Sequence, residues 1–118
     1  NLDGGTNKSI LLVIRQVGSQ GLSRDILMIL RFADSGKPEL LVAMEVAVRR
    51  GTDLALTNSY KLVPRGKKLE LEVMVDKVQG WTKENHQPSG GHGLENILTP
   101  WGKTRRVYTF AADGAREK

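Results

Sequence analysis

The stretch of residues 40–78 constrains the fold most, because its side chains alternate in character with a period of two. Successive side chains of a β-strand point to opposite faces of a sheet, so this period indicates strands with one buried and one solvent-facing side. The turns Arg50–Asp53 and Val63–Lys67 divide the stretch into three such segments. In the last segment the apolar residues Leu69, Leu71, Val73 and Val75 alternate with Glu70, Glu72, Met74 and Asp76.

Three further apolar segments lie outside this stretch, two before it and one after it. The clusters Gly18–Ser23 and Asp34–Pro38 separate the early segments, because Gly, Ser, Asp and Pro favour tight turns. Arg24–Phe32 has apolar residues at both parities, so a helix is the rival interpretation, but its short length favours a strand. We therefore predict six strands, over residues 9–17, 24–32, 39–49, 54–62, 68–78 and 103–111.

Short strands at this regular spacing are typical of a β-sandwich or a small barrel. The sequence predicts an all-β fold, an antiparallel β-sandwich of about six strands, as a single domain over residues 1–118. We expect the polar arm 1–8 and the charged tail 112–118 to be flexible ends. The predicted core consists of Leu12, Ile14, Ile26, Met28, Leu30, Val42, Met44, Val46, Leu54, Leu56, Leu69, Leu71, Val73 and Val75.

Composition limits the partners and the chemistry that the chain can have. A net charge of +5 permits anionic partners, but it is also an ordinary charge for solubility. The absence of cysteine excludes disulfides and thiolate chemistry. No apolar run reaches the roughly 18 residues of a transmembrane helix, so we expect no such segment. The chain begins at Asn1 without methionine, so either a leader was removed or this is a piece of a longer protein. We prefer a periplasmic, envelope or virion location over the cytoplasm.

The segment from about residue 80 to residue 102 is predicted to be one long loop, because no period runs through it. Loops of this length in a compact domain are often functional or disordered. It holds both tryptophans, and an indole beside amide and imidazole groups suits a protein or sugar surface. The alternative is that the tryptophans fasten the loop to the end of the sheet. The candidate partner-binding residues are Trp81, Asn85, His86, His92 and Trp101.

Basic clusters suggest nucleic-acid binding as an alternative. Arg49 and Arg50 lie at one end of the strand 54–62 and Arg65 at the other, about 30 Å apart at 3.3 Å per residue. Two separate basic tips are therefore expected, unless the strand 103–111 pairs beside the turn at residues 63–68 and brings the charges together. The candidate nucleic-acid-binding residues are Arg65, Lys67, Lys68, Arg105 and Arg106.

No motif predicts catalysis, a metal site or a cofactor. His86 and His92 are six residues apart, which matches no standard zinc spacing. The glycine-rich run Ser89–Gly93 lacks the preceding strand and following helix of a phosphate-binding loop. Neither histidine has an orienting carboxylate that the sequence can place. We therefore expect no enzyme, no metal and no cofactor.

The function that these observations favour is a non-catalytic binding or assembly module, a subunit or accessory domain of a larger complex at a cell envelope or in a viral particle. It would act through protein–protein contacts, because exposed strand edges can pair with a partner's strand and the long loop offers tryptophans. A nucleic-acid-binding domain is the alternative, and a carbohydrate-binding module that uses the tryptophan-bearing loop is a further one.

Overall fold

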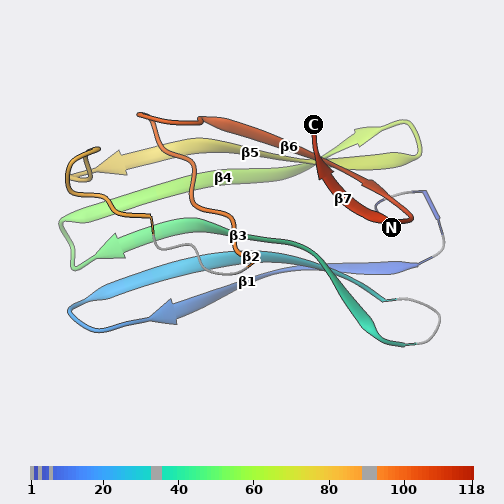
Figure 1. Ribbon diagram of the computed structural model, residues 1–118, viewed down its shortest axis with the longest axis horizontal. Coiled ribbons are helices and arrows are strands. Elements are labelled where there is room, and N and C mark those ends of the chain that lie inside the picture. The colour runs from blue at the N-terminus through green and yellow to red at the C-terminus, as the bar shows by residue number, and fades with distance from the viewer. Residues whose placement is uncertain (1, 3, 6, 33–35, 89–92) are drawn as a thin grey trace.

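Seven strands run through the part of the chain that the computed structural model describes, which comprises residues 2, 4–5, 7–32, 36–88 and 93–118. They pair antiparallel in chain order and form one open sheet (Figure 1). No helix occurs among these residues. The strands are β1 (Lys8–Val17), β2 (Leu22–Phe32), β3 (Pro38–Arg50), β4 (Leu54–Arg65), β5 (Lys68–Gln79), β6 (Arg105–Ala111) and β7 (Gly114–Glu117).

The all-β prediction is confirmed, and each predicted strand overlaps one of the strands β1 to β6. The last residues, which we expected to be a flexible tail, contain β7. This strand forms because Gly114, with a φ of 131°, turns the chain back onto β6. At the other end, Leu2 of the predicted flexible arm is buried, and its carbonyl accepts a hydrogen bond of 2.9 Å from the Leu69 N–H.

The predicted sandwich of two sheets is replaced by one open sheet. Two sheets of a sandwich are joined by side-chain packing rather than by strand pairing. Here β3 and β4 form a hairpin, in which Ala47 lies opposite Thr57 and Arg50 lies opposite Leu54. The alternation of polar and apolar residues predicts which strands have a buried face, but it does not determine which strands are neighbours.

β3 and β4 separate soon after this hairpin, and part of the loop between β5 and β6 fills the gap. Pairing of β3 with β4 stops at Ala47, although both strands continue. Beyond that point, the backbone N–H and carbonyl of Glu95 each form a hydrogen bond of 3.0 Å with β3. The Asn58 side chain on β4 exchanges two hydrogen bonds with the backbone of Leu98, of 2.9 and 3.1 Å. We call residues 95–98 the wedge segment.

The wedge segment contributes to both clusters of the hydrophobic core. Ile97 belongs to a smaller cluster with Val48, Leu56 and Trp81. Leu98 belongs to a larger cluster that β2 and β3 share with β5 and β6, so the two parts of the sheet on either side of the gap bury one common core. The larger cluster consists of Leu2, Leu27, Ile29, Val42, Met44, Val46, Leu71, Val73, Leu98, Tyr108 and Phe110.

On β1 and β2 the larger cluster lies on the face opposite to the predicted one. Leu27 and Ile29 are buried in the larger cluster, whereas their neighbour Met28 is not. The sequence could not determine this, because Arg24–Phe32 has apolar residues at both parities and a strand shifted by one residue exposes the other set. Of the predicted core residues on the other face, Ile26 is buried as predicted, whereas the remaining ones are partly buried or exposed, namely Leu12, Ile14, Met28 and Leu30.

The first prediction concerns Leu71, which is fully buried in the larger cluster. Leu71→Asp would place an unpaired carboxylate there at a cost of about 3–5 kcal/mol or more, a large part of the ~5–15 kcal/mol of a typical domain. We expect a thermal melt followed by circular dichroism to lose its cooperative transition. Met74→Asp, at a position that is 42% exposed on the same strand, is the control and should melt like the parent. A cooperative, parent-like melt of the Leu71 variant would contradict the strand parity.

Candidate functional site

Both tryptophans of the long loop pack against the smaller core cluster. Trp81 is only 8% exposed, and its Nε1 donates a hydrogen bond of 3.2 Å to the Val48 carbonyl. Trp101 is partly buried and packs against the same cluster. A buried indole normally finds such an acceptor, and it then contributes a large apolar surface to packing. The contacts fasten both ends of the loop to the sheet and leave little of Trp81 for a partner.

His86 lies between the two indole rings. Its ring centroid is 5.5 Å from that of Trp81, in an edge-to-face arrangement, and 5.8 Å from that of Trp101. Burial lowers the pKa of His86 below its ordinary value, although the negative charge of Glu45 opposes the shift. The imidazole is therefore neutral at pH 7, and its aromatic ring contributes to packing.

Asn85 stabilises the backbone of its own loop. Its Oδ1 accepts a hydrogen bond of 2.6 Å from the Thr82 N–H, and its Nδ2 donates one of 3.1 Å to the Gly80 carbonyl. Side-chain bonds of this kind fix a local turn. His92, the remaining candidate of the loop, lies outside the described residues. The loop candidates that the structure describes thus take part in holding the loop in place.

A cavity of about 340 Å³ lies beside Trp81 and His86. Two guanidinium groups, those of Arg24 and Arg50, also line it. Arg24 forms an ion pair of 3.2 Å with the Glu45 carboxylate, which is buried, so part of the positive charge is already neutralised. The cavity therefore combines planar and cationic groups without favouring one class of ligand.

The described residues of the loop cover one end of the sheet's outer side, by which we mean the side of β1, β2 and β3 that faces away from the larger cluster. Farther along these strands, apolar side chains stand in cross-strand rows, with Ile10 opposite Leu30 and Leu30 opposite Leu40. Ile10 is 46% exposed and Leu40 is 53% exposed. A bare apolar area of this kind often marks an interaction site. We call it the apolar face; its exposed members are Ile10, Ile14, Phe32 and Leu40, and its partly buried members are Leu12, Met28 and Leu30.

β1 forms the border of the sheet beside the apolar face. It pairs with β2 over ten residues without a register shift, and no other described strand pairs with its far side, which we call the β1 edge. Edge strands are usually protected by proline, a bulge or a short length. β1, with the sequence KSILLVIRQV, has no proline or glycine and carries five apolar residues in a row. The β1 edge is therefore long, regular and open to pairing.

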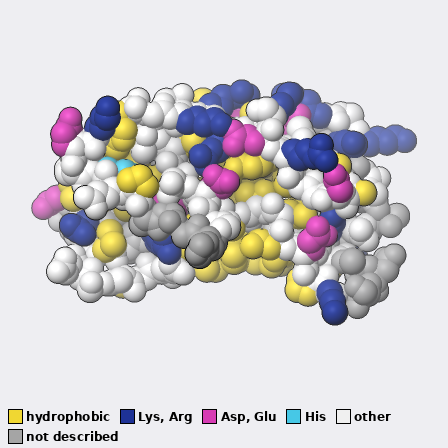
Figure 2. Space-filling model, viewed as in Figure 1, with side chains coloured by type: hydrophobic (Ala, Val, Ile, Leu, Met, Phe, Trp, Pro, Cys, Tyr) yellow, Lys and Arg dark blue, Asp and Glu magenta, His cyan; other side chains and the backbone are white. Residues whose placement is uncertain are grey.

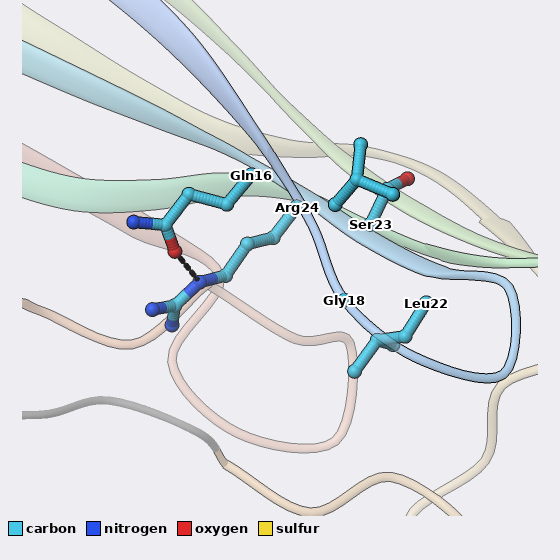
Figure 3. A pocket seen from close by; sticks show the side chains of 6 residues that line it. Gln16, Gly18, Leu22, Ser23 and Arg24 are labelled. Atoms are coloured by element: carbon cyan, nitrogen blue, oxygen red, sulfur yellow. Dashed lines mark hydrogen bonds between the residues drawn. The ribbon is translucent and has the colours of Figure 1, made fainter.

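The apolar face ends in polar side chains near the β1–β2 turn. There the Gln16 Oε1 accepts a hydrogen bond of 2.8 Å from the Arg24 Nε on the neighbouring strand (Figure 3). The two side chains help line a shallow hollow together with Leu22 and the backbone of Gly18. An apolar centre with a polar border is the usual anatomy of a protein interface.

Basic side chains from β4 and β6 converge on one side of the molecule. β6 pairs with β5 so that Arg105 lies opposite Met74, and Arg65, Arg105 and Arg106 line one hollow of about 260 Å³. This pairing is the one that we named as bringing the charges together, and Lys67 and Lys68 adjoin it at the β4–β5 turn. Lys and Arg side chains gather along this margin of the molecule, over β5 and β6 (Figure 2). We call this the basic surface, and it consists of Lys61, Arg65, Lys103, Arg105, Arg106 and Lys118.

Carboxylates are interspersed on the basic surface, and cations share them. Glu72 forms ion pairs with Arg105 at 2.7 Å and with Lys61 at 3.4 Å. The hydrogen bond from Arg105, with a further contribution from Lys61, lowers the pKa of Glu72. Three carboxylates are each shared by two of the six cations, and Arg106 also lies 3.7 Å from the Glu95 carboxylate, so the surface keeps a net positive charge. The other shared carboxylates are Glu70, between Arg65 and Lys118, and Glu117, between Lys103 and Arg106.

Neither a similar protein nor a recognisable type of site among the described residues indicates a function for this chain. Comparisons with protein families, with curated proteins and with solved structures find no match. Within the described residues, no three His, Cys, Asp or Glu side chains are grouped so that they could hold a metal ion. The same residues contain no helix that is long and apolar enough to cross a membrane. A functional proposal therefore depends on the surfaces described above.

Sequence reasoning considered exposed strand edges in general but did not find the β1 edge or the apolar face. Two signals for them were present. Ile10–Ile14 is apolar at consecutive positions, and Arg24–Phe32 is apolar at both parities. Such strands need cover on both faces, and a short chain with a single core cannot supply it everywhere.

The second prediction tests the packing of the loop. Trp81→Ala removes a buried ring and its hydrogen bond, so urea denaturation should show a loss of about 3–5 kcal/mol. Trp101→Ala should cost clearly less, because Trp101 is only partly buried. If the Trp81 variant were as stable as the parent, the loop would not be fastened through this side chain.

Proposed function

We propose that this chain is a non-catalytic assembly module that joins protein chains by extending its sheet at the β1 edge. The observation that carries the proposal is that the β1 edge adjoins the apolar face. A strand added there would gain main-chain hydrogen bonds and also bury apolar side chains. Contacts of this kind suit a subunit or accessory domain of a larger structure, such as a cell envelope or a viral particle.

The side chains of β1 indicate which residues the partner segment should carry. Its centre is apolar, so the partner should be an extended strand with apolar side chains at alternate positions. Lys8 and Arg15 lie on either side of this centre, so polar or acidic residues are favoured opposite them. Because Trp81 is buried, we assign it to the packing of the loop and not to the contact with the partner.

The third prediction uses a displayed library of random ten-residue peptides as the probe. We expect the wild-type protein to enrich peptides with alternating apolar residues, since these can pair with β1. Ile10→Lys combined with Ile14→Lys places two charges on the apolar face beside the β1 edge. Fluorescence anisotropy should show that this double variant binds the enriched peptides about tenfold more weakly or worse, which is ~1.4 kcal/mol or more.

The matched control is Met74→Lys combined with Val78→Lys on β5, where the two side chains have similar exposure. It should bind the peptides like the parent, and both double variants should keep a cooperative melt. If both lost binding equally, or if no strand-forming peptide were enriched, the β1 edge would not be an assembly site.

The basic surface favours a second function, the binding of nucleic acid through its phosphate backbone. The convergence of Arg65, Arg105 and Arg106 is the observation that supports it. Guanidinium groups match phosphate oxygens well. The shared carboxylates compete for the same groups, so we expect weak binding that depends on salt and not on base sequence.

The fourth prediction is a salt titration with a labelled, random-sequence single-stranded oligonucleotide, followed by anisotropy. Each phosphate contact contributes about −0.7 to the slope of log affinity against log salt. Arg105→Gln should weaken binding and make the slope shallower by about one contact. Arg50→Gln, which removes an exposed cation at the other end of β4, should change neither. No binding at about 50 mM salt, or equal effects of both variants, would contradict this second function.

A further inference from the structure

We infer that the strand added at the β1 edge is β1 of a second copy of this chain, paired antiparallel about a twofold axis at Leu12. The inference rests on the proposed assembly function and names its partner. β1 is itself a regular extended strand with an apolar centre. It therefore has the chemistry that the β1 edge requires of its partner.

The length of the sheet's two border strands favours pairing of β1 with β1. Head-to-tail pairing would set the ten residues of β1 against the four residues of β7. Most of β1 would then remain unpaired, and repetition of the contact would give an open filament. Pairing of two β1 strands matches equal lengths and closes the assembly at two copies.

The side chains of β1 fit this pairing best when the axis passes through Leu12. Residues directly opposite each other in an antiparallel pair lie on the same face and interact. With Leu12 on the axis, residues 8–16 pair so that apolar residues meet apolar residues, polar residues meet polar residues, and like charges never lie opposite each other; only Val17, at the end of β1, meets the polar Asn7. The pairs between the two copies are Leu12 with Leu12, Leu11 with Val13, Ile10 with Ile14, Ser9 with Arg15, and Lys8 with Gln16.

In neighbouring registers the opposite side chains match less well. An axis at Val13 would place Arg15 opposite the apolar Leu11, and an axis at Leu11 would place Lys8 opposite Ile14. An axis between two residues would place each odd-numbered residue opposite an even-numbered one. The outer side of one copy would then continue as the core side of the other. Only the axis at Leu12 keeps the match and joins the two apolar faces into one continuous surface.

The fifth prediction exploits the absence of cysteine from the chain. In Leu12→Cys the two Cα atoms would be about 4.5–5.5 Å apart, which suits a disulfide. In Ile10→Cys they would be offset by roughly 13 Å along the strands, which is too far. Under mild oxidation we expect a covalent dimer of the Leu12 variant on a non-reducing gel. Ile10→Cys and Ile14→Cys should not crosslink alone but should crosslink when mixed.

Two results would overturn the inference. Crosslinking of Leu11→Cys or Val13→Cys in place of Leu12→Cys would show a different register. A monomer in sedimentation, with no crosslink in any variant, would exclude a second copy as the partner. The reduced variants should melt like the parent, which controls for misfolding. If the strand-forming peptides still bound at the β1 edge, the assembly function would stand with another protein as partner, and if they did not, both proposals would fail.

Discussion

The hydrogen bonds that hold the wedge segment between β3 and β4 are the constraint on which the rest of the fold depends. Where β3 and β4 separate, their backbone groups lose their partners, and buried groups without partners are costly. The backbone of Glu95 forms hydrogen bonds with backbone groups of β3, and the Asn58 side chain joins the backbone of Leu98 to β4. The separation lets the two parts of one sheet bury a common core without a second sheet, and the wedge segment lets them do so without leaving the gap empty.

The same arrangement explains why the apolar face is bare. The loop that contains the wedge segment crosses the sheet near Val48 and Leu56, and there Trp81 and Ile97 cover the outer side. Farther along the sheet, the described part of this loop leaves Ile10 and Leu40 about half exposed. The chain thus uses its one long loop to close the gap and one end of the sheet, and it leaves apolar side chains beside an unprotected edge strand. We therefore propose that the loop is structural and that the β1 edge is the functional feature.

The sequence predicted β1 to β6 because turn-forming residues separate most of them and because polar and apolar residues alternate clearly on β5, but it missed β7. It did not predict how the strands are arranged. Leu27 and Ile29 could not be told from Met28 and Leu30, because both sets are apolar and only the packing of the other strands decides which set is buried. The convergence of Arg65 with Arg105 depended on β6 pairing with β5, a long-range contact that no local pattern determines. The contacts of Glu95 and Asn58 are likewise made between residues far apart in the chain.

The claim that β1 pairs with β1 of a second copy can be tested most directly by residue-resolved amide hydrogen exchange of the unmodified protein at low and at high concentration. Amides that point outward from an edge strand exchange readily unless another strand pairs with them. If two β1 strands pair, alternate amides of β1 become more protected as the concentration rises, while those of β7 do not change. Exchange along β1 that is identical at both concentrations would contradict this pairing.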